Sequence, residues 1–282
     1  MNASNLRTLA LVGHGGAGKT TLIENLLAAS GAIPAAGSVE RGSTVCDYDP
    51  LEKAHLHSIK VAAAHLQHQD CLVHLLDTPG YPDFMGQALC ALDAVETVVV
   101  VIDAHKGVEL TTHRMMHWAQ TRKLCRMIVI NKIDAPDIDL PALLEEIQTA
   151  FGRECLPINL PADGGKSVTD CFFNPSGAAD FSSVEAAHRA LVDQVVEVYQ
   201  KFAEGGGKIL GRSIRDVNTV NGVRVTLEDG AWVLVRASSN KPELVVVVES
   251  MTSDDDMKAL FREEVKPRLA RFAEVGAYNQ EI

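Results

Sequence analysis

The stretch LALVGHGGAGKTTLIENLL, residues 9–27, decides the fold of the N-terminal half of this 282-residue chain. An apolar run at residues 8–12 leads into the pattern GxxxxGK[ST], and a helical pattern over residues 19–30 follows it. Glycines in such a loop let backbone N–H groups turn toward phosphates at the start of a helix. A Gly-rich turn that only joins strand to helix is the alternative. Because motif and context agree, we expect a phosphate-binding loop.

Both backbone and side chains of this loop are expected to contact a nucleotide. Lys19 can reach the outer phosphates, and the hydroxyl of Thr20 suits a magnesium ion. The residues predicted to bind nucleotide here are Gly13, His14, Gly15, Gly16, Ala17, Gly18, Lys19, Thr20 and Thr21.

Three further apolar runs follow in the first half of the chain, at residues 71–76, 96–103 and 125–130. Helical patterns come after them, at residues 84–94, 110–122 and 140–151. Runs such as TVVVVID are almost continuously apolar, as is typical of strands buried on both faces of a parallel sheet. The sequence therefore predicts an α/β fold in which a P-loop NTPase domain is built on a parallel sheet.

Two more motifs stand at the ends of predicted strands. In DTPG, Asp77 can hold a magnesium-bound water and Gly80 can sense a terminal phosphate, although DTPG alone would be an ordinary turn. In NKID, which contains Asn131, Lys132 and Asp134, the carboxylate of Asp134 only accepts hydrogen bonds. It can pair with N1–H and the exocyclic amine of guanine, whereas adenine presents a bare acceptor at N1. The three motifs in order predict GTP or GDP as the ligand, with Mg²⁺.

The segments GHGGAGKTTL, GSVERGSTVCDYDPLEKAHLHSI, DTPGYPDF and NKID together resemble the GTPase domain of translation elongation factor G, in particular its divergent bacterial paralogs. The resemblance covers residues 5–196 and implies a magnesium-dependent GTPase. It also implies contact with the ribosome, although the domains that reach the ribosome in that family have no counterpart here.

Three departures from that family bear on activity. The family's magnesium-binding Thr falls at Ser58, which makes Thr20, Ser58 and Asp77 the expected metal-binding residues. Tyr81 replaces the His that orients the attacking water, and a neutral phenol lacks the charge and geometry of an imidazole. The expected catalytic residues are Lys19, Gly80 and Tyr81, and we expect slow hydrolysis. The family's final Gly-Ser-Ala element, which meets the guanine carbonyl, is not found.

The last part of the chain changes its pattern. A helical pattern at residues 184–203 is followed by the break EGGGK. After the break, apolar residues alternate with polar ones, and the segments GVRVTLEDG and AWVLVRASS are predicted to form a hairpin. A third strand, PELVVVVES, and a helix over residues 254–272 follow. The sequence thus predicts two domains, at residues 1–200 and 205–282, the second of them a small α+β unit.

This second domain is similar to the C-terminal domain of the phosphomannomutase and phosphoglucomutase family. The resemblance implies a phosphate-sugar site, and the matching residues are Arg236, Ser238, Ser239, Asn240 and Lys241. A polar hairpin turn is the alternative. The chain has neither the phosphorylated-serine loop nor the metal loop of those enzymes, so we expect no mutase activity. The combination suggests a truncated GTPase domain joined to a truncated mutase domain.

Charge and hydropathy limit the partners. A formal net charge of -11 without clustered Lys and Arg argues against a general electrostatic grip on nucleic acid. The start of the chain shows neither a secretory signal nor a membrane span, which predicts a cytoplasmic protein. The leading hypothesis is a GTP-binding protein with weak hydrolysis. The alternatives are a nucleotide-binding module without turnover and a sugar-phosphate-binding fragment.

Overall fold

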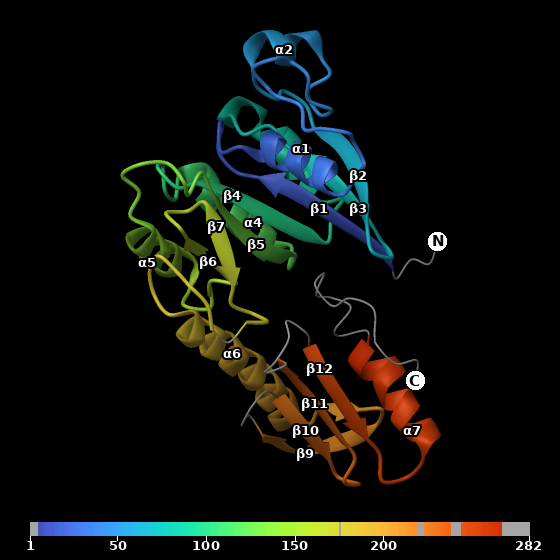
Figure 1. The fold of residues 1–282 in the computed structure, drawn as a ribbon. Helices are drawn as coiled ribbons and strands as arrows, with labels where there is room; N and C mark the ends of the chain where they lie inside the picture. The colour runs from blue at the N-terminus through green and yellow to red at the C-terminus, as the bar shows by residue number, and fades with distance from the viewer. Residues whose placement is uncertain (1–4, 175, 219–222, 238–243, 267–282) are drawn as a thin grey trace. The chain divides into compact units, whose positions relative to one another are not determined.

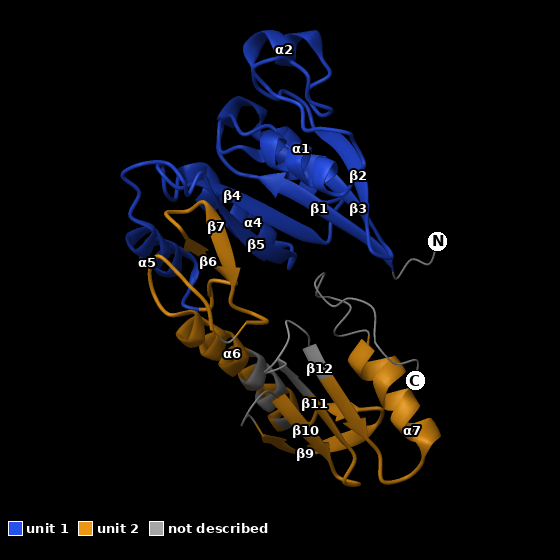
Figure 2. Cartoon of the chain, viewed as in Figure 1, with its two compact units in different colours: residues 1–153 blue, residues 154–282 orange. Residues whose placement is uncertain are grey.

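The computed structural model describes residues 5–174, 176–218, 223–237 and 244–266 (Figure 1). The chain divides into two compact units, residues 1–153 and residues 154–282 (Figure 2). Among the described residues, no helix has both the length and the apolar composition needed to cross a membrane.

Unit 1 is built on a five-stranded sheet in the order β2-β3-β1-β4-β5. Its central strand β1 (Leu6–Val12) pairs in parallel with β3 (Cys71–Asp77) and with β4 (Thr97–Asp103), and β4 pairs in parallel with β5 (Cys125–Asn131). The predicted parallel sheet is thereby confirmed. Strands β1, β3 and β5 end at the three predicted motifs, so those motifs lie together at the carboxyl ends of the parallel strands.

The edge strand β2 (Ala62–His68), antiparallel to β3, was not predicted. Its residues alternate between buried and exposed, as a half-buried strand requires. The alternation is hidden in the sequence because the apolar positions are mostly alanines, which favour strands weakly.

The helices of unit 1 fall close to their predicted positions. They are α1 (Lys19–Ala29), α3 (Met85–Leu92), α4 (Leu110–Thr121) and α5 (Leu140–Phe151), with a short α2 (Pro50–His55) and a 3₁₀ turn η2 (Pro82–Phe84) that were not predicted. Ile23 and Leu27 of α1 pack on Leu11 of β1 and Leu75 of β3, and all four are buried. This packing fixes the start of α1 directly beyond the end of β1.

Unit 2 combines a hairpin, a long helix and an antiparallel sheet. The hairpin consists of β6 (Asn159–Ala162) and β7 (Ser167–Asp170), and the helix is α6 (Val184–Glu204). The sheet has the order β12-β11-β10-β9-β8. Its strands are β8 (Lys208–Ile209), β9 (Arg212–Asn218), β10 (Val223–Leu227), β11 (Trp232–Ala237) and β12 (Leu244–Glu249).

The small α+β unit that the sequence predicts is confirmed, with additions. The hairpin β10–β11, strand β12 and the start of the last helix lie where expected, and that helix continues from α7 (Asp254–Ala259) into a π-helical turn η3 (Leu260–Val265). Strands β6 to β9 were missed because they are short or carry many polar residues. The predicted domain boundary at residues 200–205 stays a prediction, while the compact units divide at residue 153.

Candidate functional site

The loop between β1 and α1 has a backbone that only glycine can supply at two positions. Gly13 has φ +144°, and a Cβ there would meet the carbonyl oxygen of Val101. Gly18, at the N-cap of α1, has φ +92°, and a Cβ there would meet the side-chain amide of Asn131. The left-handed conformation and the close approach of backbone atoms both exclude a side chain. The local sequence therefore dictates a tight loop at the helix N-terminus.

The side chain of Lys19 lies within this loop. It is only 6% exposed, and its Nζ donates hydrogen bonds to the carbonyl oxygens of Gly13 (3.1 Å) and His14 (2.9 Å). Burial lowers the pKa of the Lys19 ammonium from 10.5 to about 8, and the negative charge of Asp77 opposes this shift. An anion such as a phosphate would supply the buried cation with the counter-charge it lacks.

Thr20 and Asp77, predicted as metal-binding residues, lie in direct contact. The Thr20 hydroxyl donates to Asp77 Oδ2 at 2.6 Å, and Ser58 Oγ lies 3.3 Å from Thr20 Oγ1. The hydroxyl of Ser58 also donates to Asp47 Oδ1 at 2.8 Å. All three predicted metal-binding residues are therefore brought together from α1, β3 and the segment between α1 and β2.

The carboxyl group of Asp77 is 1% exposed, and its Oδ1 has no hydrogen-bond partner in the part of the chain that is described. Burial raises the pKa of this carboxyl from 3.8 to about 6, and the hydrogen bond from Thr20 opposes the rise. A buried acceptor without a partner is costly unless a ligand satisfies it. Hydroxyl and carboxylate oxygens are the ligands that Mg²⁺ prefers, so these residues fit a magnesium ion.

The segment between α1 and β2, residues 30–61, is held by three buried carboxylates that the sequence analysis did not identify. Glu24 accepts hydrogen bonds from the backbone N–H groups of Gly37 and Val45. Glu52 accepts from the N–H groups of residues 59 and 60, and Asp47 accepts from the hydroxyl groups of residues 44 and 58. Together these bonds place Ser58 beside Thr20. Glu52 has a signal in the sequence, because Asp49-Pro50-Leu51-Glu52 has the spacing of a capping box and begins α2. No comparable spacing marks Glu24 or Asp47.

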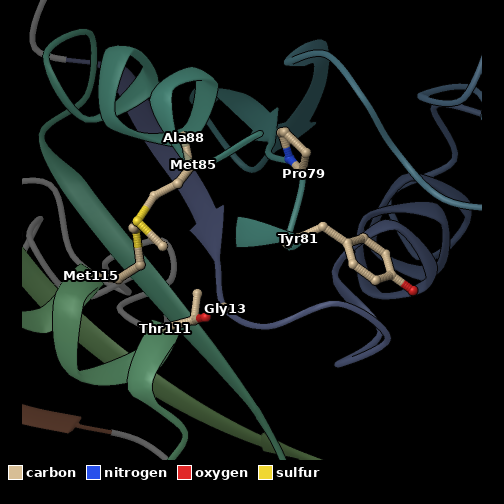
Figure 3. Close-up of a pocket in the computed structure, with 8 residues that line it drawn as sticks. Gly13, Pro79, Tyr81, Met85, Ala88, Thr111 and Met115 are labelled. Atoms are coloured by element: carbon tan, nitrogen blue, oxygen red, sulfur yellow. The ribbon is translucent and has the colours of Figure 1, made fainter. Parts of the chain in front are cut away.

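Gly80 and Tyr81 cover the phosphate loop from the end of β3. A Cβ on Gly80 would meet Lys19 Nζ and the His14 carbonyl. The Tyr81 ring lies close to Gly15, where a Cβ would stand 3.0 Å from two ring atoms, and the tyrosine is 44% exposed. Gly80 and Tyr81 both line a small pocket, and Figure 3 shows the Tyr81 ring pointing away from Met85 and Met115. Gly80 and Tyr81, two of the three predicted catalytic residues, therefore adjoin the loop that holds the third, Lys19.

Replacing Gly80 by alanine should weaken nucleotide binding because the added methyl group takes the space of the Lys19 ammonium. We expect a loss of about tenfold or more in GTP affinity, the size of one weakened charged hydrogen bond. Gly86→Ala is the matched control, since a Cβ there meets nothing within 4 Å and position 86 lies inside helix α3. Equal GTP affinity for both variants in a titration would contradict this role of Gly80.

The NKID motif follows β5 and reaches back to the phosphate loop. Asn131 Nδ2 donates to the Ala17 carbonyl at 2.9 Å, and Lys132 Nζ donates to the Gly16 carbonyl at 2.8 Å and to Asp103 Oδ2 at 2.6 Å. Asp134 is exposed. Two side chains of the motif, Asn131 and Lys132, thus donate hydrogen bonds to the phosphate loop, and the carboxylate of Asp134 is accessible to a ligand.

The side chain of His14, a predicted nucleotide-binding residue, is buried. Its Nδ1 lies 2.9 Å from the Gly15 carbonyl and 3.7 Å from a Glu109 carboxylate oxygen, and the N–H of Asp103 donates to its Nε2 at 3.4 Å. The side chain therefore ties the loop to β4 and to the start of α4. Thr21, by contrast, is exposed on α1.

The predicted phosphate-sugar site of the second domain is not assembled in the described structure. Residues Ser238, Ser239, Asn240 and Lys241 lie outside the described residues, and only the backbone of Arg236 is described, as part of β11. That site stays a prediction from sequence.

Comparison with known proteins gives consistent matches. The protein-family model of the elongation factor Tu GTP binding domain matches residues 4–266 of this chain. An elongation factor G-like protein of Mycobacterium tuberculosis is 35% identical over 207 residues, which cover 68% of this chain and 28% of that protein. Peptide chain release factor 3 of Bordetella avium is 36% identical over 170 residues, which cover 59% of this chain and 32% of that protein.

A crystal structure of a protein from Thermus thermophilus has 34% sequence identity and a TM-score of 0.64, and the match covers 73% of this chain and 34% of that one. The chain thus spans about a third of the length of these proteins or less. The matches support the elongation-factor resemblance. They give the mutase resemblance no support, and the match to the GTP-binding domain includes residues 205–266, part of the segment for which the sequence predicts a mutase-like domain.

Proposed function

The chain belongs to the family of the elongation factor Tu GTP-binding domain, and on this premise we propose that it binds GTP and GDP with Mg²⁺ and hydrolyses GTP slowly. The observation that carries the proposal is the contact between Thr20 and Asp77 beside the buried ammonium of Lys19. A buried cation and a buried, unsatisfied carboxylate side by side suit a phosphate and a divalent cation respectively.

The phosphates would lie against the glycine loop, where backbone N–H groups point outward from the N-terminus of α1. Lys19 would exchange its two carbonyl acceptors for phosphate oxygens. Thr20, Ser58 and Asp77 would hold the magnesium ion directly or through water. The ion supplies positive charge that offsets the negative charge developing on the phosphates during hydrolysis.

The base would lie beside the NKID motif, with Asp134 accepting hydrogen bonds from N1–H and the amine of guanine. Asn131 and Lys132 donate hydrogen bonds to the phosphate loop, so the base contacts would be linked directly to the phosphate contacts. The family's Gly-Ser-Ala contact to the guanine carbonyl was not found in the sequence. We therefore propose looser binding than in a domain with all the motifs.

Slow turnover is proposed because position 81 holds a phenol next to the phosphate loop. A neutral phenol cannot reproduce the charge or the geometry of an imidazole that orients water. The competing proposal is a nucleotide-binding module with no turnover.

Single-turnover hydrolysis of GTP with Mg²⁺ should proceed slowly, and it should stop when EDTA removes the metal. Phosphate release from radiolabelled GTP measures both, with the Lys19→Ala variant as the blank. A rate equal to that blank would favour the binding module, and a rate unaffected by EDTA would contradict the assignment of Thr20, Ser58 and Asp77.

The partners and location are proposed from the relatives. The matched proteins are named as an elongation factor G-like protein and peptide chain release factor 3. We propose contact with the ribosome and a cytoplasmic location on that basis.

A further inference from the structure

His57 lies beside Tyr81, although the two residues belong to different segments. Their ring centroids are 4.6 Å apart with an angle of 49° between the ring planes, and the Phe84 ring is 6.1 Å from that of His57. His57 is half-buried in this aromatic group. An imidazole packed on two aromatic rings has less rotamer freedom than one on an open surface.

The backbone around His57 is fixed by hydrogen bonds to Glu52, next to the proposed metal-binding residue Ser58. The N–H of His57 donates to the Glu52 carbonyl at 3.2 Å, and the N–H of Ile59 donates to the Glu52 side chain at 2.9 Å. Ser58, between them, is the residue whose hydroxyl lies 3.3 Å from Thr20. The backbone of His57 is therefore fixed next to Ser58, near the proposed metal site. Its ring packs on Tyr81, near the phosphate loop.

The hydrogen bonding of the ring indicates which nitrogen is available. Nδ1 of His57 lies 3.3 Å from the carbonyl oxygen of Ser58. A carbonyl oxygen only accepts hydrogen bonds, so this contact requires a proton on Nδ1, and in the neutral imidazole Nε2 is then the acceptor. Within the described residues no hydrogen bond reaches Nε2. The ring can thus accept a hydrogen bond from a water molecule.

The position of Tyr81 locates this acceptor relative to the phosphates. Tyr81 follows Gly80, which packs on the Lys19 ammonium, and its ring lies over Gly15. His57 packs on that ring. We infer that His57 orients the water that attacks the outer phosphate of GTP. In this chain the imidazole for that role would come from the segment between α1 and β2.

This inference rests on the proposed GTP hydrolysis. In that reaction the water oxygen forms a bond to the γ-phosphorus while the bond from phosphorus to the bridging oxygen breaks. GDP leaves with the electron pair of that bond, and the proton lost by water ends on the inorganic phosphate. Nε2 of His57 accepts a hydrogen bond from the attacking water. This bond orients the water so that a lone pair of the water oxygen points toward the phosphorus.

Three variants of the full chain test the role of His57. His57→Ala removes the acceptor, and we expect the single-turnover rate to fall by about 100-fold while GTP affinity stays unchanged. His57→Gln keeps an acceptor oxygen and should give an intermediate rate. His55→Ala removes a neighbouring imidazole, whose ring lies 5.8 Å from that of His57, and should keep the wild-type rate.

The readouts are GTP affinity by titration and the rate of the first turnover with Mg²⁺. Wild-type affinity with equal rates for the wild type and His57→Ala would overturn the role of His57 and leave nucleotide binding intact. GTP binding without any turnover by the wild type would overturn it in the same way. A wild type that does not bind GTP would overturn both this inference and the proposed function.

Discussion

Replacing Lys19 by methionine should reduce GTP affinity by at least about 100-fold, which corresponds to about 3 kcal/mol. Methionine keeps an unbranched stem of similar length but removes the ammonium that would meet the phosphates. The Lys19 ammonium is buried within the loop, where it donates to the carbonyl oxygens of Gly13 and His14. A calorimetric titration with GTP and Mg²⁺ measures the effect.

The same variant should not lower the stability of the protein without nucleotide. Burial lowers the pKa of Lys19 from 10.5 to about 8, so the folded state disfavours the charged form relative to the unfolded state. The difference corresponds to a cost of up to about 3 kcal/mol at neutral pH. We expect Lys19→Met to raise the free energy of unfolding of the nucleotide-free chain. Loss of binding together with a gain in stability distinguishes a ligand-binding lysine from a structural one.

The control is Lys166→Met, at an exposed lysine of unit 2. Both GTP affinity and stability should remain unchanged there. If Lys19→Met binds GTP as tightly as the wild type, or unfolds more easily than Lys166→Met, the role assigned to Lys19 is wrong.

Replacing Asp134 by asparagine should change which base the site prefers. The carboxylate offers only acceptors, and guanine presents N1–H and an amine as donors. An asparagine amide places its own donor against one of them, and a buried donor left unpaired costs about 1 to 3 kcal/mol. We expect GTP affinity to fall by about 100-fold and xanthosine triphosphate, which has an oxygen in place of the amine, to bind better than GTP.

Asp137→Asn is the matched control, because it makes the same change at an exposed residue three positions further along the same loop. Asparagine also tolerates the positive φ of 60° at that position. Competition between the two triphosphates for a fluorescent nucleotide measures the preference. An unchanged preference for GTP in Asp134→Asn would show that another group selects the base.

Much of unit 1 follows from its sequence because local pattern and tertiary structure agree. The run TVVVVID becomes the buried strand β4, and Gly13 and Gly18 of the loop occupy positions where a Cβ would clash. The three motifs could be combined into one site because the carboxyl ends of parallel strands share one edge of the sheet.

Much of the rest of the site depends on tertiary contacts. The capping-box spacing of Asp49 and Glu52 predicts the start of α2, but it does not predict that Glu52 is buried and bonded to residues 59 and 60. Asp47 looks like an ordinary surface acid in DYDPLEKAH, yet it is buried and accepts a hydrogen bond from Ser58. The packing of His57 on Tyr81 joins residues from two loops, and it appears only when the chain has folded. Strand β2 was missed because its apolar positions are mainly alanines.

The most direct test of guanine-nucleotide binding is a calorimetric titration of the whole chain with GTP and, separately, with ATP, both with Mg²⁺. Saturable binding of GTP with ATP at least about 100-fold weaker is the predicted result, since both contacts of Asp134 fail with adenine. ATP bound as tightly as GTP, or no binding of GTP at all, would contradict it.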